Sequence, residues 1–312
     1  MIGVCIVTYN QEAYIAKAVE SVLEQVDCPD AIRIYIGNDC STDGTAAICE
    51  QYAIKYPETV RLINNRENLG LVGNTINVLK AILEDGCNYV AMLDGDDYWC
   101  DSLKLKKQLE YLAARPDYGF VHTRNFVLVD DHLIRPKRPT PPTGSVFSSI
   151  SSFPIANCTV LFRIELIKTL QLDELKNRGF MSLDYVMYAL FSSITSFGFL
   201  EDYTAVWRRG HSSVSNPNDE TKQISYLNND KAMWQYLSEK FPDHITFSEE
   251  QWNRYYSFRV FNIAFRFRDY PLAHSLIPQL RDRSGLKFKV KKFFARNKLL
   301  FYFWTYFLHH FV

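Results

Sequence analysis

Residues 90–99 read Val-Ala-Met-Leu-Asp-Gly-Asp-Asp-Tyr-Trp, an apolar run followed directly by three carboxylates within four positions. A short apolar run bounded by a turn signal is typical of a buried strand. In open α/β sheets, ligands bind at the carboxyl ends of the strands, where Asp94, Asp96 and Asp97 would lie. Because adjacent carboxylates repel one another, a divalent cation that prefers oxygen ligands, Mg²⁺ or Mn²⁺, would stabilise them. The alternative is an acidic surface turn, since Asp-Gly is a common turn dipeptide.

The composition is that of a folded globular protein, because 47% of the 312 residues are hydrophobic and 22% are charged. This length suffices for one large domain or two ordinary ones.

Seven cysteines without CxxC spacing indicate a reducing compartment and no zinc site. The first apolar run begins at Gly3, which leaves no room for a signal peptide, so we expect a cytoplasmic protein. The formal net charge is zero, and we expect no nucleic acid partner.

An alternation of strand and helix signals fills the first third of the chain. Buried strands are predicted from the apolar runs at 3–7, 33–36, 60–63 and 90–93. Apolar residues spaced three and four apart predict a helix after each of the first three runs. This order is typical of right-handed βαβ units and a mostly parallel sheet, hence of an α/β fold. Polar residues follow three of the strands, at 8–10, 38–43 and 94–97, and we expect these loops to converge on a pocket because parallel strands end at one edge.

The polar segments at the strand ends resemble those of the family 2 glycosyltransferases in content and order. They read Val-Thr-Tyr-Asn at 7–10, Asn-Asp-Cys-Ser-Thr-Asp-Gly-Thr at 38–45, Glu-Asn-Leu-Gly at 67–70 and Leu-Asp-Gly-Asp-Asp at 93–97. The resemblance covers roughly the first two-thirds of the chain. It implies the GT-A fold, a Rossmann-like, mostly parallel sheet flanked by helices, in a bacterial polysaccharide-type enzyme of the cell envelope. The implied activity is transfer of a hexose from a nucleotide-sugar donor, and a UDP-sugar is the donor that we expect first. The implied mechanism is a metal-assisted single displacement that inverts the configuration of the anomeric carbon.

The resemblance assigns the donor site to these loops and to one later strand. Tyr9 would stack on the base, Asp39 would hydrogen-bond it, and Asp94 would face the sugar and ribose. Asn38 stands where the family usually has Asp, so either Asn38 or Asp39 could read the base, because an amide both donates and accepts. The family's Ala-Arg-Asn is absent after the Asn-x-Gly loop, and we expect Arg66 to contact the diphosphate instead. The donor-binding residues are then Val7, Tyr9, Asn38, Asp39, Arg66, Asn68, Asp94, Gly95 and Arg208.

Packing or capping alone would explain single pieces of this site. Tyr9 could be a core aromatic at the end of a strand, and residues 41–44 are rich in the side chains that cap helices. The order and spacing of all the pieces together favour the glycosyltransferase interpretation.

By the same resemblance, Asp96 and His211 would bind the divalent metal, Mn²⁺ or Mg²⁺, and Asp184 would be the catalytic base. Asp184 begins a predicted helix, where a carboxylate can also act as a cap. The family's Glu-Asp pair is Leu183-Asp184 here, so only the second acid matches. When the acceptor hydroxyl attacks the anomeric carbon from the face opposite the diphosphate, a base is needed to accept the proton of that hydroxyl. The metal stabilises the leaving group, so no protonating acid is required.

Two other functions are compatible with part of the pattern. A nucleotidyltransferase acting on sugar phosphates also joins a parallel sheet to an acidic metal site. The Gly-rich, basic phosphate loop typical of that class is absent near the N-terminus of this sequence. A non-catalytic module that binds nucleotide or metal would explain the acidic loops, but neither Asp184 nor His211.

We expect a catalytic domain at 1–218, with a nucleotide-sugar half up to about residue 100 and an acceptor half beyond it. In the acceptor half, the sequence predicts strands at 118–129, 159–163 and 200–206 and a helix from Asp184 through Ile194. After residue 219 the strand signals stop, and aromatic-rich patterns predict a helical C-terminal region at 219–312.

The C-terminal tail combines positive charge with aromatic residues. Residues 281–298 hold eight Lys or Arg against one Asp, and an apolar run follows at 299–312. This run is shorter than the ~20 residues that span a bilayer, and its cationic flank and Trp/Tyr content are typical of an interfacial helix. We therefore expect residues 286–312 to contact the inner face of a membrane, where a glycan or lipid-linked saccharide would be the acceptor. A core helix or a homodimer contact is the alternative.

Overall fold

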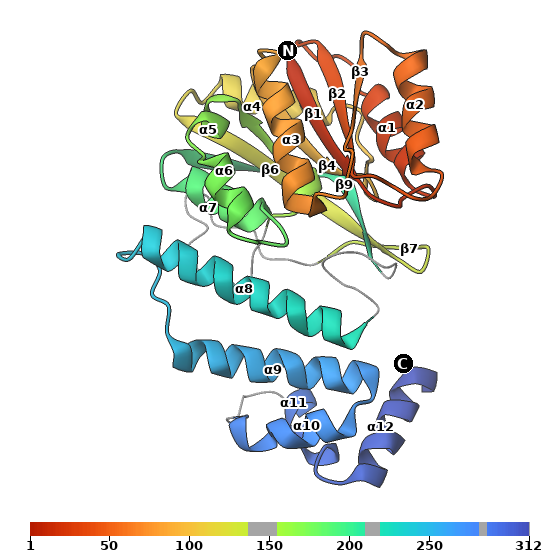
Figure 1. The fold of residues 1–312 in the computed structure, drawn as a ribbon, viewed down its shortest axis with the longest axis vertical. Helices are drawn as coiled ribbons and strands as arrows, with labels where there is room; N and C mark the ends of the chain where they lie inside the picture. The colour runs from red at the N-terminus through yellow and green to blue at the C-terminus, as the bar shows by residue number, and fades with distance from the viewer. Residues whose placement is uncertain (137–154, 210–218, 281–285, 312) are drawn as a thin grey trace. The chain divides into compact units, whose positions relative to one another are not determined.

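The structure is a computed structural model that describes residues 1–136, 155–209, 219–280 and 286–311. It contains two compact units, residues 1–210 and residues 211–312. The first unit is of the α/β class, and the second is helical (Figure 1).

A nine-stranded sheet forms the centre of the first unit (Figure 1). Its strands are β1 (Ile2–Thr8), β2 (Ile32–Asn38), β3 (Val60–Asn64), β4 (Tyr89–Asp94), β5 (Tyr98–Trp99), β6 (Tyr118–Val129), β7 (His132–Ile134), β8 (Leu161–Arg163) and β9 (Ser196–Arg209). They follow the order β3-β2-β1-β4-β8-β6-β9-β5, with β7 paired to β6. Strands β1 to β4 are parallel, as predicted, and β6 is parallel to β9. Strand β8 runs antiparallel to both of its neighbours, β4 and β6.

Helices cover both faces of this sheet. They are α1 (Ile15–Leu23), α2 (Thr45–Lys55), α3 (Gly70–Glu84), α4 (Lys104–Ala113), α5 (Glu165–Lys168), α6 (Leu172–Asn177) and α7 (Asp184–Ser192). On one face, Ile15 and Val19 of α1 join a buried core with Val4 of β1. On the opposite face α3 approaches so closely that a Cβ at Gly3 would lie 2.6 Å from Ile82 Cγ2. All seven residues of β1 are therefore buried, which explains its continuous apolar run.

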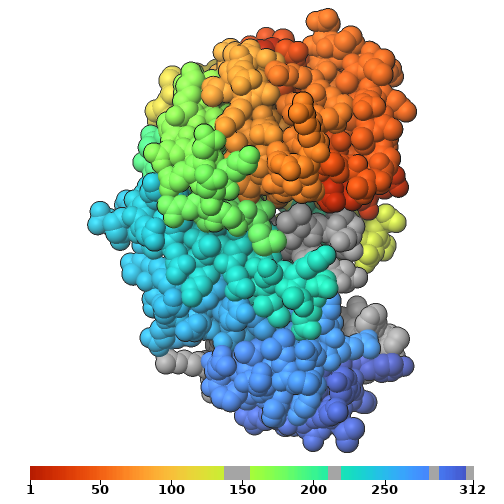
Figure 2. Space-filling view, viewed as in Figure 1, coloured from red at the N-terminus to blue at the C-terminus, as the bar shows by residue number. Residues whose placement is uncertain are grey.

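Helices α3 and α6 lie side by side on the surface of the first unit, in orange and green in Figure 2. Lys80 Nζ of α3 lies 2.7 Å from Asp173 Oδ1 of α6. Both side chains are largely exposed to solvent, so water screens this ion pair and the buried core supplies most of the stability.

The strand predicted at 159–163 is shorter than expected, because its first residue belongs to a 3₁₀ turn, η2 (Asn157–Thr159). The N–H and the hydroxyl of Thr159 both donate to the carbonyl of Ala156, at 3.0 and 2.6 Å. These bonds close the turn, and only Leu161–Arg163 continue as β8.

Two neighbouring boundaries also differ from the prediction. Helix α7 ends at Ser192 and therefore excludes Ile194, while β9 is longer than the predicted strand at 200–206. The hydroxyls of Ser192 and Ser193 donate to carbonyls of the last turn of α7. Serine side chains that bond to the backbone in this way compete with helix continuation.

The second unit consists of helices, as its aromatic-rich pattern predicts. They are α8 (Glu220–Lys240), α9 (Glu249–Phe267), α10 (Tyr270–Leu276), η3 (Ile277–Gln279), α11 (Leu286–Phe294) and α12 (Lys298–Phe311). The side chains of Asp219, Ser248 and Asp269 cap α8, α9 and α10 by accepting an N–H three residues further on. Phe261 of α9 and Phe301 of α12 are fully buried in the core of the unit. In the described part of the chain, we find no helix with the length and apolarity needed to cross a membrane.

Candidate active site

The carboxyl ends of β1, β2 and β4 meet at one edge of the sheet, as the parallel order predicts. Thr8 is paired with Asn38, and Val7 is paired with Asp94. The N–H of Gly95 donates to the carbonyl of Val7 at 3.0 Å, and a Cβ at Gly95 would lie 2.9 Å from Cβ of Thr8. Because a larger residue would not fit, glycine allows the acid loop, residues 94–97, to lie directly against the end of β1.

Hydrogen bonds join the loop after β1 to the loop after β2. The N–H of Asn10 donates to Ser41 Oγ at 3.1 Å, and the N–H of Thr42 donates to Asn10 Oδ1 at 2.8 Å. The N–H of Gln11 donates to Thr45 Oγ1 at 2.8 Å. The convergence of these loops, expected from the sequence, is therefore confirmed.

The packing and capping alternatives have different outcomes. Asp43 Oδ1 accepts the N–H of Thr45, the first residue of α2, at 3.0 Å, so Asp43 caps this helix, whereas Gly44 at the N-cap position makes no side-chain hydrogen bond. Tyr9 is 45% exposed, so its interpretation as a core aromatic is wrong. Its ring is accessible to a ligand at the edge where the loops meet.

Asn38 and Asp39, the two candidates for reading the base, are both buried and bonded to neighbouring loops. Asn38 Nδ2 donates to Asn64 Oδ1 at 2.9 Å, and Asn38 Oδ1 accepts the Ser41 hydroxyl at 2.6 Å. Asp39 Oδ1 accepts the N–H of Leu69 at 2.8 Å. Both side chains therefore determine the course of the loops at this edge of the sheet.

The loop between β3 and α3 brings two more of the predicted residues to this edge. Asn68 Nδ2 donates to the carbonyl of Asp39 at 3.3 Å. The carbonyl of Arg66 accepts the thiol of Cys40, with a sulfur–oxygen distance of 3.9 Å. Arg66 and Asn68 are exposed, so the guanidinium of Arg66 is available to an anionic ligand.

The carboxylates of the acid loop destabilise one another's ionised forms. Burial, and then the charges of Asp96 and Asp184, raise the pKa of Asp94 to about 7. Burial and the charges of Asp96 and Asp94 raise the pKa of Asp97 as well. Asp97 is buried, and its Oδ1 accepts the N–H of Arg208 at 2.9 Å, which gives it a structural role in joining the acid loop to β9.

A divalent cation fits the chemistry of this loop. Its positive charge would favour the ionised carboxylates, and hard oxygen donors suit Mg²⁺ or Mn²⁺. Asp96 is partly exposed and so remains accessible to an ion. Within the described residues, no three His, Cys, Asp or Glu side chains are placed to hold a metal ion. His211, the second predicted ligand, lies outside the described residues.

Strand β9 brings Arg208 beside the acid loop, because Val206 is paired with Tyr98. The guanidinium carbon of Arg208 lies 4.9 Å from the centre of the Tyr98 ring and 5.2 Å from that of Tyr14. Its Nε is buried and has no hydrogen-bond partner in the part of the chain that the structure describes. A positioned guanidinium with an unused donor is suited to binding phosphate oxygens.

Asp184, the first residue of α7, lies one helical turn before Tyr188, whose hydroxyl donates to Asn157 Oδ1, and Asn157 Nδ2 in turn donates to Asp94. The carboxylate of Asp184 accepts hydrogen bonds from the Ser182 hydroxyl and the Tyr185 N–H. Burial nevertheless raises the pKa of Asp184 above its ordinary value. A carboxylate with a raised pKa is a stronger base at neutral pH, and Asp184 is partly exposed and so accessible to a substrate.

Two residues that contact the acid loop or its neighbours were not predicted from the sequence. Asn157 Nδ2 lies 3.1 and 3.3 Å from the two carboxylate oxygens of Asp94, to which it donates. The Tyr188 hydroxyl donates to Asn157 Oδ1 at 2.7 Å. The sequence signal for Asn157 was its polar side chain within the apolar segment before β8. The sequence signal for Tyr188 was its position four residues after Asp184, on the same face of the predicted helix.

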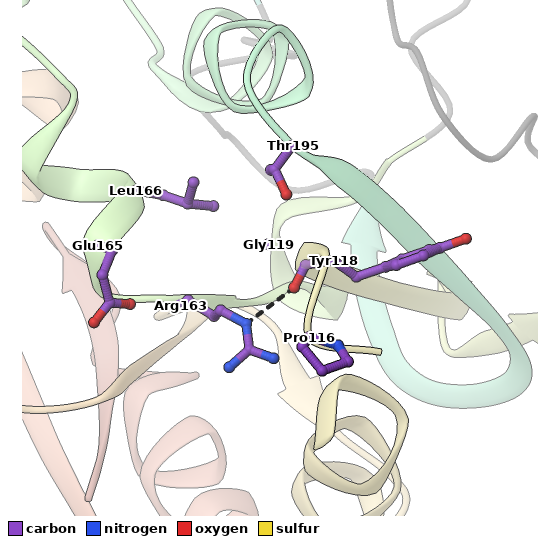
Figure 3. A pocket seen from close by; sticks show the side chains of 7 residues that line it. All are labelled: Pro116, Tyr118, Gly119, Arg163, Glu165, Leu166 and Thr195. Carbon is purple, nitrogen blue, oxygen red and sulfur yellow. Dashed lines mark hydrogen bonds between the residues drawn. The ribbon is translucent and has the colours of Figure 1, made fainter. Parts of the chain in front are cut away.

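A cavity of about 350 Å³ lies at the opposite end of the sheet (Figure 3). It is lined by Pro116, Tyr118, Gly119, Arg163, Glu165, Leu166 and Thr195. Arg163 is paired with Tyr89, the first residue of β4, whereas the acid loop begins at the last residue of β4. The Arg163 Nε donates to the carbonyl of Tyr118 at 3.0 Å (dashed line in Figure 3). This cavity is therefore separate from the candidate active site.

Comparison with known proteins identifies the family. The family model for glycosyl transferase family 2 matches residues 3–170, more than half of the chain. The chain therefore belongs to this family and is a glycosyltransferase. The dTDP-rhamnosyl transferase RfbG of Shigella flexneri is 32% identical to this chain over 107 aligned residues. The aligned segment covers 34% of this chain and 36% of RfbG. The uncharacterised Mycobacterium tuberculosis protein Rv1520 is 39% identical to this chain over 112 aligned residues. The aligned segment covers 36% of this chain and only 31% of Rv1520.

Solved structures confirm the expected GT-A fold. Staphylococcus aureus TarS in complex with UDP-GlcNAc superimposes with a TM-score of 0.56 at 16% identity, over 96% of this chain and 88% of the TarS chain. The mannosyltransferase PcManGT of Pyrobaculum calidifontis, in complex with GDP-Man and Mn²⁺, gives a TM-score of 0.57 at 14% identity, over 97% of this chain and 82% of PcManGT. At these identities the similarity concerns the fold alone.

Proposed function

We propose that this glycosyltransferase moves a hexose from a UDP-linked donor to a glycan or lipid-linked saccharide, with inversion at the anomeric carbon. The observation that carries the proposal is the position of Asp184 on α7, because hydrogen bonds through Tyr188 of the same helix and Asn157 join that helix to Asp94 of the acid loop. In a single displacement, Asp184 accepts the proton of the acceptor hydroxyl while that oxygen bonds to the anomeric carbon. The nucleoside diphosphate leaves from the opposite face with the electron pair of the broken bond.

The donor would lie along the converging loops. We assign Tyr9 to stacking on the base and Asp39 to reading it, with Asp94 facing the sugar and ribose. Arg66 and Arg208 are the cations available to the diphosphate, because one is exposed and the other carries an unused Nε donor in the described structure. UDP is the first choice of nucleotide, and the TarS structure, which contains UDP-GlcNAc, shares this fold.

Asp96 and His211 would hold Mn²⁺ or Mg²⁺. When bound, the ion neutralises negative charge on the leaving diphosphate. Support comes from the oxygen donors of the acid loop and from the raised pKa of Asp94, which an adjacent cation would lower. The PcManGT structure, which has the same fold, contains Mn²⁺.

Thermal melting of the purified chain with nucleoside diphosphates tests the donor and the metal together. We expect UDP with Mn²⁺ to raise the melting temperature more than GDP or dTDP does, and EDTA to remove the effect. With a UDP-hexose and an acceptor, the enzyme should release UDP. Release of pyrophosphate from a nucleoside triphosphate would instead indicate a nucleotidyltransferase, and binding without UDP release would indicate a non-catalytic module.

We also propose that the second unit contacts the inner face of an anionic membrane, where a lipid-linked acceptor would lie. Helix α12 buries Phe301 in the core of the unit but exposes Leu299 and Phe303, by 81% and 65%. Phe293 of α11 is 56% exposed, and the cations Lys289, Arg296 and Lys298 are exposed in the same two-helix segment. Exposed aromatic rings beside cations are suited to the interface of anionic lipids.

Replacing Leu299 and Phe303 together with Ser should remove membrane binding without unfolding the unit, because both side chains are exposed. We expect the unaltered chain to co-sediment with phosphatidylglycerol vesicles, less so at high salt, and the double variant to stay in the supernatant. Ile54→Ser is the matched control, because Ile54 is 80% exposed on the first unit. Equal sedimentation of all three proteins would contradict the proposal, and a change from dimer to monomer in the double variant would indicate a homodimer contact.

A further inference from the structure

We propose that Asn157, held by Tyr188, is a positioning residue that fixes the carboxylate of Asp94 relative to the helix that carries the catalytic base. This inference rests on the proposed function, in which Asp94 faces the donor and Asp184 faces the acceptor. It concerns side chains that contact neither substrate and that act through Asp94.

The Asn157 amide is bonded at both ends. Its Nδ2 donates to both oxygens of Asp94, at 3.1 and 3.3 Å, and its Oδ1 accepts the Tyr188 hydroxyl at 2.7 Å. A carboxylate only accepts, and the Tyr188 hydroxyl is available as a donor. These partners select one orientation of the amide, so the Nδ2 group faces Asp94.

The hydroxyl of Tyr188 is itself fixed by the core. Tyr188 is fully buried, and its ring stacks on Phe120 with a centroid distance of 5.9 Å. Tyr188 also lies one helical turn beyond Asp184 on the same face of α7. A shift of α7 would therefore move the base and the Tyr188 hydroxyl together. Through Asn157, the position of Asp94 is coupled to the position of Asp184.

The turn that carries Asn157 is also held by the chain just after the acid loop. The carbonyl of Cys158 accepts the indole N–H of Trp99 at 2.9 Å. The 3₁₀ turn η2 thus contacts Asp94, at the start of the acid loop, and Trp99, two residues after its end. With the backbone positions fixed in this way, the Asn157 amide has little freedom to move away from Asp94.

Binding of UDP with Mn²⁺, measured by calorimetry, tests this coupling. Asn157→Ala should weaken UDP binding about tenfold, because Asp94 loses its donor, and Tyr188→Phe should weaken it about threefold. Because Tyr188 acts through Asn157, the double variant should bind no more weakly than Asn157→Ala alone. In transfer assays the KM for the donor should rise, while the KM for the acceptor should stay unchanged.

Tyr35→Phe is the matched control. The Tyr35 ring is fully buried and its hydroxyl donates to Asp85 Oδ2 at 2.8 Å, near the amino end of β4 and away from the site. It should lower the melting temperature as Tyr188→Phe does but leave UDP binding unchanged. The near-isosteric Tyr188→Phe keeps the test valid if Asn157→Ala fails to fold.

Three outcomes would overturn the inference. Normal UDP binding by Asn157→Ala or by Tyr188→Phe would show that the amide does not position Asp94. Additive losses in the double variant would show that Tyr188 does not act through Asn157. Absence of UDP binding by the unaltered chain would contradict the proposed function, and the inference that rests on it would fail with it.

Discussion

Replacing Asp184 with Asn should lower the turnover number of sugar transfer by about 100- to 10,000-fold, the usual contribution of a general base. Asn has almost the same shape as Asp but cannot accept the proton of the acceptor hydroxyl at neutral pH. UDP binding should remain close to that of the unaltered enzyme, because Asp184 is assigned to the acceptor side. Single-turnover transfer and calorimetric UDP binding, measured on one preparation, separate these two effects.

Asp173→Asn is the control for this substitution. Asp173 is a surface carboxylate of the same unit, with 81% of its side chain exposed, and its change should leave transfer unaffected. If Asp184→Asn lost UDP binding together with transfer, the residue would belong to the donor site or to the fold rather than to the acceptor side. Full activity of Asp184→Asn would exclude it as the base.

The pH dependence of transfer follows from the same carboxylate. Burial raises the pKa of Asp184, so the ionised form that can accept a proton decreases as pH falls through that raised pKa. We expect the acidic limit of activity to lie above the ordinary pKa of an Asp side chain. In Asp184→Asn, the residual activity should lose this acidic limb.

The parallel half of the fold could be predicted because its signals are local. Each of β1, β2 and β4 is an apolar run that ends in polar residues, and parallel strands necessarily bring those ends to one edge. The hydrogen bonds of Asn10 to Ser41 and of Gly95 to Val7 confirm that the loops after these strands meet. The position of Tyr9 at this edge was predictable for the same reason.

The acceptor half was harder to predict because its contacts are long-range. The reversal of β8 follows from pairing with β4 and β6, which no local pattern specifies. The turn at Asn157 replaces the start of a predicted strand, because Thr159 bonds back to Ala156 instead of continuing the ladder. The contact of Asn157 with Asp94 then depends on that turn, so a polar residue in an apolar segment could be noticed in the sequence but not assigned to Asp94.

Arg208 shows an intermediate case. Its position soon after a predicted strand placed it near the donor diphosphate by resemblance. Its surroundings come from two other segments, since Tyr14 lies in one of them and the adjacent residues Asp97 and Tyr98 lie in the other. Such a constellation is defined only once the sheet has formed, because β9 must pair with β5 to bring these side chains together.

Replacing Asp96 with Asn should remove the effect of the metal on stability. The charge of Asp96 raises the pKa of both Asp94 and Asp97, and a divalent ion would offset this repulsion. With Mn²⁺ and UDP, the variant should lack the increase in melting temperature that we expect of the unaltered enzyme, because the proposed ligand is missing.

Transfer by Asp96→Asn should fall by at least about 100-fold, since a bound ion contributes several kcal/mol of charge stabilisation in the transition state. Asp131→Asn is the control, because Asp131 is an exposed carboxylate in the turn between β6 and β7. Its melting temperature should respond to Mn²⁺ and UDP as that of the unaltered chain does. If Asp96→Asn kept the increase with Mn²⁺, the ion would be held by other groups.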